Sequence, residues 1–229
     1  MFNGVDLVSP ESGNRGKELR KALGIPGDRL ILLFVGKLEP HKGIREFVAA
    51  LGSLRQHSDR FAVVVVGDGP LRKELEARAE EANLSGSLFF AGSVPHDRVP
   101  DYLALADVYV SLNREGNLSN TVLEALQARK CIVRLSSSAT LCKDLFTDQV
   151  LGEAVAEVID RDRVEELLPG LLLRLIDDRE LIARKGRKSE EVAQAYLVSW
   201  ERRIGEEIAF IKRAATTGAC LEASDWGRN

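Results

Sequence analysis

The run Leu30-Ile31-Leu32-Leu33-Phe34-Val35 is continuously apolar and is followed by Gly36. A strand that helices cover on both faces of a parallel sheet has this kind of sequence. A second such run, Phe61-Ala62-Val63-Val64-Val65-Val66, is followed by Gly67. Residues 44–54 lie between the two runs and carry apolar side chains at helical spacing. The order strand, helix, strand is typical of one crossover unit of a parallel sheet.

The same alternation continues along the chain. We expect further strands at residues 88–90, 107–111, 131–135 and 154–159, and helices at 71–82, 99–106 and 121–129. Short loops between alternating strands and helices indicate right-handed crossovers. The sequence therefore predicts an α/β fold: one Rossmann-like, doubly wound parallel sheet with helices on both faces.

We expect one domain over residues 1–215, with a linker and leading segment at 1–29 and C-terminal helices at 163–215. Residues 216–229 carry no periodic pattern and are expected to be a disordered tail. A length of 229 residues suits one large α/β domain. Within the helical region, Arg184-Lys185-Gly186-Arg187-Lys188 is interpreted as a solvated helix face, at which a weak membrane contact is left open.

Composition limits the function classes. The net charge of -3 argues against a nucleic-acid partner held by a broad basic surface. No apolar run approaches ~18 residues, and the first residues lack a signal-peptide pattern, so a cytoplasmic protein is expected, with the inner face of a membrane left open. The 3 cysteines have no ligand spacing, so neither zinc nor a disulfide framework is indicated. No cofactor is expected. Cys131 is interpreted as a buried thiol.

Ligands of doubly wound sheets bind outside the carboxyl ends of the strands, so the loops at that edge are the candidates. The first loop, residues 36–43, contains Lys37 and Lys42 between glycines. Lysine ammonium groups suit phosphate oxygens, although two solvated surface lysines explain the pattern equally well. The second loop, Gly67-Asp68-Gly69-Pro70, lacks the third glycine of a dinucleotide fingerprint and is interpreted as a turn, with a base or ribose nearby left open.

The third loop, residues 114–121, leads into a predicted helix that carries Glu124. Backbone N–H groups and the helix dipole at such a start favour a diphosphate. Ser119 or Asn120 is alternatively a plain helix cap, and Glu124 is alternatively an acid that complements the dipole. Both interpretations stay open on these residues alone.

Taken together, five motifs resemble the C-terminal domain of the GT-B glycosyltransferases, in particular glycosyltransferase family 4. They are Phe34-Val35-Gly36-Lys37-Leu38 with Lys42-Gly43, Val66-Gly67-Asp68-Gly69-Pro70, Phe90-Ala91-Gly92, Ala106-Asp107-Val108 and Val122-Leu123-Glu124-Ala125-Leu126. The resemblance begins at Asn3-Gly4-Val5-Asp6, which is similar to the family's interdomain linker, and it ends near residue 201.

The resemblance implies roles residue by residue. Contacts to the donor diphosphate are implied for Gly36, Lys37, Lys42, Leu118, Ser119, Asn120 and Thr121. Contacts to the ribose and base are implied for Glu124, Ala91, Gly92 and Val94. Glu115 is similar to the first glutamate of the family's glutamate pair and is the candidate catalytic residue.

The implied activity is retaining transfer of a sugar from a nucleotide-diphosphate sugar to a glycan or lipid-linked acceptor, without a required metal. The family has an N-terminal acceptor-binding domain, and without it we expect the chain to be inactive. Three features depart from the family pattern. Arg129-Lys130 stands where a small residue and a glycine usually precede the next strand. Eight residues separate Glu115 from Glu124 where the family has seven, and residues 136–140 replace a glycine pair and an acid, with Asp144 a loose substitute.

Alternative functions stay open. The altered glutamate spacing also suits a non-catalytic or regulatory glycosyltransferase-like module, and a nucleotide-sugar epimerase shares the two-domain architecture. A nicotinamide dehydrogenase is disfavoured, because the first strand ends in Gly36-Lys37-Leu38 and not in a glycine fingerprint. The three histidines, His41, His57 and His96, are interpreted as surface residues.

Overall fold

The computed structural model describes residues 10–116, 118–137, 150–197 and 200–217. The linker match at residues 3–6, most of the loop after residue 135 with Asp144, and the end of the proposed tail lie outside the described residues.

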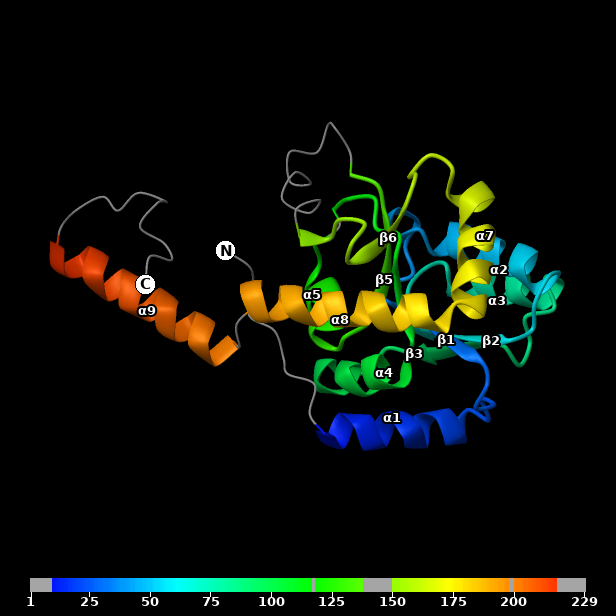
Figure 1. Cartoon of the computed structure of the whole chain (residues 1–229), viewed down its shortest axis with the longest axis horizontal. Coiled ribbons are helices and arrows are strands. Elements are labelled where there is room, and N and C mark those ends of the chain that lie inside the picture. Colours follow the sequence, from blue (N-terminus) through cyan, green and yellow to red (C-terminus); the bar gives the residue numbers. More distant parts are fainter. Residues whose placement is uncertain (1–9, 117, 138–149, 198–199, 218–229) are drawn as a thin grey trace.

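The described chain forms one six-stranded sheet (Figure 1). Its strand order is β3-β2-β1-β4-β5-β6, and every neighbouring pair is parallel. This order is the Rossmann arrangement, so the predicted fold class is confirmed. The strands are β1 (Leu30–Val35), β2 (Phe61–Val66), β3 (Leu88–Gly92), β4 (Val108–Ser111), β5 (Cys131–Leu135) and β6 (Ala156–Ile159).

Helices cover both faces of the sheet, as expected. Alternate residues of β1 point to opposite faces of the sheet. Leu30 and Leu32 belong to one buried cluster, and Ile31 belongs to the other. The first cluster takes side chains from α2 (Ile44–Arg55), α3 (Arg72–Glu81) and α7 (Val164–Asp177). The second takes them from α4 (Val99–Leu105), α5 (Asn120–Gln127) and α8 (Arg179–Tyr196). Burial on both faces explains why the central strands are continuously apolar.

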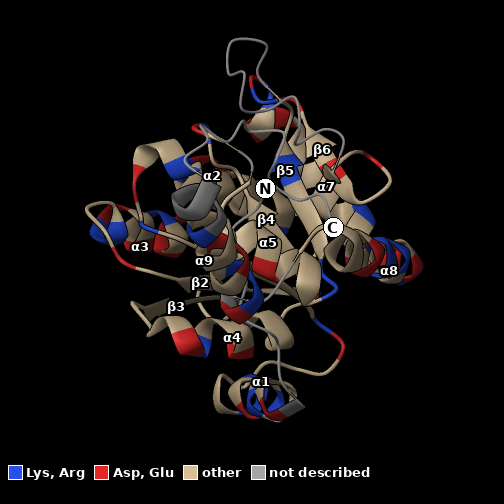
Figure 2. Cartoon of the chain, turned by 90° about the vertical axis from the view of Figure 1, so that its left-hand side faces the viewer, with Lys and Arg blue, Asp and Glu red and all other residues tan. Residues whose placement is uncertain are grey.

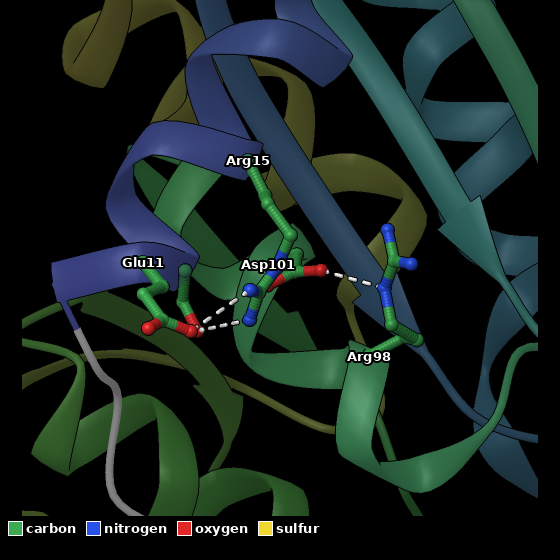
Figure 3. A network of polar contacts seen from close by, with 5 residues as sticks. Glu11, Arg15, Arg98 and Asp101 are labelled. Carbon is green, nitrogen blue, oxygen red and sulfur yellow. Dashed lines mark hydrogen bonds and ion pairs between the residues drawn. The ribbon is translucent and has the colours of Figure 1, made fainter.

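One helix, α1 (Pro10–Ala22), was not predicted. It lies against α4, and Figure 3 shows Arg15 and Arg98 both directed at Asp101. The Asp101 carboxylate is fully buried and accepts from Arg15 Nε at 2.8 Å and from Arg98 Nε at 2.7 Å. Gly16 permits the close approach, because a Cβ there would lie 2.8 Å from the Leu105 nitrogen. A helix held by a buried carboxylate and a glycine contact leaves little apolar periodicity in the sequence.

The basic run at residues 184–188 is a second correction. Figure 2 shows Lys and Arg interspersed with Asp and Glu along α8. Lys185 is buried, lies 3.0 Å from Glu157 Oε1 and donates to the Ala156 carbonyl at 3.1 Å. A buried ammonium needs such partners, so this lysine fastens α8 to β6. The interpretation of the whole run as a solvated face was wrong for Lys185.

The last helix, α9 (Trp200–Thr217), projects away from the sheet and its covering helices (Figure 1). Ile204, Ile208 and Ile211 are 50%, 48% and 64% exposed. Their spacing of four and three residues places them on one face of the helix. In the described part of the chain, no helix is both long and apolar enough to cross a membrane.

Candidate functional site

The strand order reverses between β1 and β4, which are neighbours in the sheet although two strands separate them in sequence. Connections on either side of such a point run in opposite directions and leave a crevice outside the carboxyl ends of the strands. The loops after β1 and β4 meet there: the backbone N–H of Arg114 donates to the His41 carbonyl at 2.8 Å. The first and third candidate loops are therefore brought together, as expected.

Glycines allow these loops to pack closely. Gly43 has φ +69°, and a Cβ there would lie 2.5 Å from the Leu112 Cβ. Gly67 has φ +125° and packs directly on the backbone of Gly36. The Gly36 N–H donates to the Val66 carbonyl at 3.0 Å, and the Leu38 N–H donates to the Asp68 carbonyl at 3.0 Å. The first loop is thus held against the second.

A pocket of about 310 Å³ lies at this crevice. Five of the predicted diphosphate residues line it: Gly36, Lys37, Lys42, Ser119 and Thr121. Lys42 is half-buried at the end of η1 (Pro40–Lys42), whereas Lys37 is exposed. Two ammonium groups at one concave site create a positive potential that attracts an anionic ligand. Leu118 and Asn120 lie in the same turn but outside the lining.

Helix α5 begins at this pocket. Ser119 is its N-cap, and its Oγ accepts from the Val122 N–H at 3.4 Å. The N-terminus of a helix carries a partial positive charge, so α5 adds to the field of the two lysines. The capping interpretation of Ser119 is confirmed, and it is compatible with a ligand at the helix start.

Tyr109 also lines the pocket and is buried. Its hydroxyl lies near the side chains of Thr121, Ser119 and Ser111. Burial, followed by the charge of Glu124, raises the pKa of Tyr109 well above its usual range. The phenol therefore stays neutral and adds a hydroxyl group to those at the start of α5. The sequence reasoning did not identify this residue, although a tyrosine in an apolar strand next to a polar loop was a usable signal.

A second pocket, of about 390 Å³, adjoins the first, and Val35, Gly36 and Lys37 line both. Val94, a predicted base contact, lies in its lining together with Val66 and Val99. Ala91 and Gly92, the other two predicted base contacts, end β3 next to it but are not part of the lining. The second pocket offers an apolar wall beside the cationic first pocket.

Glu124 is 2% exposed, in the first turns of α5. Its Oε1 lies 3.3 Å from His96 Nε2, which belongs to η2 (His96–Arg98). The exposed position of His96 agrees with the sequence interpretation, but its contact with Glu124 was missed. The two residues are far apart in sequence, and no local pattern joins them.

Glu115, the candidate catalytic residue, is not in the lining of either pocket. Its side chain is 69% exposed, and its Oε2 lies 3.7 Å from His41 Nε2. Asn113 shapes this turn, because its Nδ2 donates to the Gly116 carbonyl at 2.7 Å and its Oδ1 accepts from the Glu115 N–H at 3.3 Å. The turn thus directs Glu115 toward the first loop, and its catalytic role stays a prediction.

Among the described residues, no three His, Cys, Asp or Glu side chains are grouped so that they could hold a metal ion. The cationic groups at the site are Lys37 and Lys42. The arrangement can bind a multiply charged anion in one pocket and a planar or apolar group in the other.

Known proteins share the family and the fold of this chain. Residues 16–192 match the family model described as Glycosyl transferases group 1. The chain is 34% identical over 124 residues to 2-deoxystreptamine N-acetyl-D-glucosaminyltransferase of Streptomyces fradiae, a match that covers 53% of this chain and 30% of that protein.

Two solved structures show the same fold. HepE of Anabaena, in complex with UDP and glucose, has a TM-score of 0.72 at 18% identity, over 96% of this chain and 56% of that one. The C-terminal domain of the glycosyl transferase group 1 family protein LpcC from Francisella tularensis has a TM-score of 0.68 at 18% identity, over 84% of this chain and 95% of that one. The chain spans less than half the length of the curated relatives it matches.

Proposed function

The chain belongs to the group 1 glycosyltransferase family, and on that premise we propose that it is the donor-binding domain of a retaining glycosyltransferase. The enzyme would transfer a sugar from a nucleotide-diphosphate sugar to a glycan or lipid-linked acceptor. The observation that carries the proposal is the pocket at the strand-order reversal, where Lys37, Lys42 and the N-terminus of α5 meet.

The diphosphate is assigned to this pocket on electrostatic grounds. A nucleoside diphosphate carries its charge on oxygens that accept from ammonium groups and from backbone N–H groups. As the bond to the sugar breaks, negative charge develops on the departing diphosphate. Lys37 and Lys42 line the pocket that would hold this charge, and α5 begins at it, so these groups are in place to lower the barrier. The proposal therefore requires no metal ion.

The base is assigned to the adjoining pocket, and the ribose to the place where the two pockets meet. Val94 lines the adjoining pocket, the backbone of Ala91 and Gly92 ends next to it, and the Glu124 carboxylate is a suitable acceptor for ribose hydroxyls. The two pockets share lining residues, so one sugar nucleotide can occupy both. The fold neighbour from Anabaena binds UDP and glucose, which supports a donor of this class.

The exposed face of α9 is an argument for a second, acceptor-binding domain that packs against it. Its exposed isoleucines, Ile204, Ile208 and Ile211, form an apolar stripe of the kind that packs against another protein surface. We assign this stripe to an N-terminal domain that seats the acceptor and excludes water from the sugar. Without that domain the chain binds the donor but transfers little or no sugar. We place the enzyme in the cytoplasm, at the inner face of a membrane where the acceptor is lipid-linked.

Hydrogen exchange with and without UDP-glucose, GDP-mannose or ADP-glucose tests the assignment. We expect slower exchange at residues 36–43 and 118–123, and no change around the larger hollow of about 790 Å³ between α2 and α3. Protection at that hollow, or at neither place with all three ligands, would refute the donor site. A radiolabelled transfer assay tests inactivity, because measurable transfer by this chain alone would contradict it.

A second candidate function is a regulatory, non-catalytic glycosyltransferase-like module. The position of Glu115 favours it, because the side chain is 69% exposed, lies beside His41 and is not part of the lining of the donor pocket. The two candidates differ in one measurement. With the acceptor-binding domain supplied, an active enzyme loses turnover in a Glu115→Gln variant, whereas a regulatory module shows no turnover to lose.

A further inference from the structure

The contact between His96 and Glu124 joins two elements that follow the carboxyl ends of β3 and β4. His96 belongs to η2, which follows β3, and Glu124 belongs to α5. The His96 side chain is 60% exposed, whereas the Glu124 side chain is 3% exposed. The histidine therefore lies at the surface over a carboxylate that is otherwise inside the protein.

Neither His96 nor Glu124 lines a pocket, but each has a neighbour that does. Val94 and Val99, on either side of His96 in sequence, line the second pocket, of about 390 Å³. Tyr109, whose pKa is raised in part by the charge of Glu124, lines the smaller one. A ligand with its diphosphate in the smaller pocket and its base in the larger one carries its ribose between them, next to Glu124.

A ribose needs a correctly oriented acceptor. Its 2′ and 3′ hydroxyls both donate, and an ionised carboxylate accepts through two oxygens. A carboxylate removed from water is costly unless other groups donate to it. The His96 Nε2, at 3.3 Å from Oε1, is placed to donate one such hydrogen bond and to fix the plane of the carboxylate.

We propose that His96 is a positioning residue that orients Glu124 to accept hydrogen bonds from the ribose of the donor nucleotide. The inference rests on the proposed function, because it presumes a nucleotide between the two pockets. His96 acts through Glu124 and takes no part in the transfer itself.

Binding of ribose and dideoxyribose nucleotides distinguishes this role from a purely structural one. UDP, GDP and ADP, each with its 2′,3′-dideoxy counterpart, are titrated by calorimetry into the chain and into His96→Leu and His96→Gln variants. Glutamine keeps an N–H donor, whereas leucine does not. His57→Leu is the matched control, because His57 is exposed and its Nδ1 lies 3.0 Å from the Ser53 carbonyl of α2, far from both pockets in the described chain.

We expect His96→Leu to weaken the ribonucleoside diphosphate about tenfold, the loss of one hydrogen bond to a charged group. The dideoxy counterpart should bind all variants alike, and His96→Gln should recover most of the affinity. Equal losses for both nucleotides, no loss for either, or a glutamine variant as weak as the leucine variant would overturn the inference. If the unaltered chain binds none of the three nucleoside diphosphates, the proposed function fails, and the inference fails with it.

Discussion

Replacing Gly67 by alanine tests how the first loop packs against the second. Gly67 has φ +125°, a conformation that L-residues rarely adopt. An added Cβ would lie 2.9 Å from the Gly36 carbonyl carbon and closer still to its oxygen. Both atoms belong to backbone, so no flexible side chain can give way. Gly67→Ala must therefore shift the first loop or the second.

The expected cost follows from two contributions. A residue held in a sparsely populated backbone region costs about 1–3 kcal/mol. Overpacking at a well-packed position adds about 1–3 kcal/mol. The variant should thus lose about 2–6 kcal/mol of unfolding free energy, out of about 5–15 kcal/mol for an ordinary domain. Gly36 lines both pockets, so nucleotide affinity should fall as well.

Gly86→Ala is the matched control. Gly86 also has a positive φ, +76°, but nothing lies within 4 Å of an added Cβ. It should lose only the backbone contribution, about 1–2 kcal/mol, and keep its nucleotide affinity. Urea unfolding and calorimetric titration measure both quantities. If Gly67→Ala is no less stable than Gly86→Ala and binds nucleotide as well, the close contact between the loops does not exist in solution.

Three further outcomes are expected. Asp101→Asn should lose about 1–3 kcal/mol in urea unfolding, because a buried acceptor of the Arg15 guanidinium is replaced in part by a donor. The hydrogen bond from Arg45 lowers the pKa of Glu74. The pair therefore stabilises the fold at pH values above 4.5, the ordinary pKa of this carboxyl group. The stabilisation is lost as the pH falls through the lowered pKa. The stability difference between the chain and Glu74→Gln should therefore shrink in acid. Burial raises the pKa of Cys131 to about 12, so iodoacetamide at pH 8 should label it only after unfolding, as peptide mapping can show.

Each of these outcomes has a contrary result. An Asp101→Asn variant with unchanged stability would mean that α1 is held by its glycine contact alone. If the stability difference between the chain and Glu74→Gln grows as the pH falls, the pKa of Glu74 is not lowered by folding. Labelling of Cys131 in the native protein would contradict its burial in β5.

The strands were predictable because their signal is local. Each central strand is a short apolar run that ends at a polar or glycine-containing loop, and the order of runs and helices implies a parallel sheet. The positions of Lys37 and Lys42 followed directly, since a loop after a parallel strand must lie at the carboxyl edge. The position of a residue was predictable from the sequence where it depends on a single strand or on the loop that follows that strand.

Features that need two distant elements were not predictable. Helix α1 is held by Asp101 of α4, and Lys185 is buried because Glu157 of β6 lies beside it. The contact of His96 with Glu124 depends on how η2 and α5 meet across the sheet edge. The direction of Glu115 depends on the side-chain hydrogen bonds of Asn113, which a count of residues between two glutamates does not reveal.

The central claim is that Lys42 and its pocket bind the diphosphate of a sugar nucleotide. Its most direct test is calorimetric titration of UDP-, GDP- and ADP-sugars into the chain, into Lys42→Ala and into Lys21→Ala. The Lys21→Ala control removes an equal charge from an exposed position of α1. We predict that at least one donor binds and that Lys42→Ala alone weakens it by about 10–100-fold, the loss of a hydrogen bond to a charged group. Binding of no donor, or equal affinity in the two lysine variants, would contradict the claim.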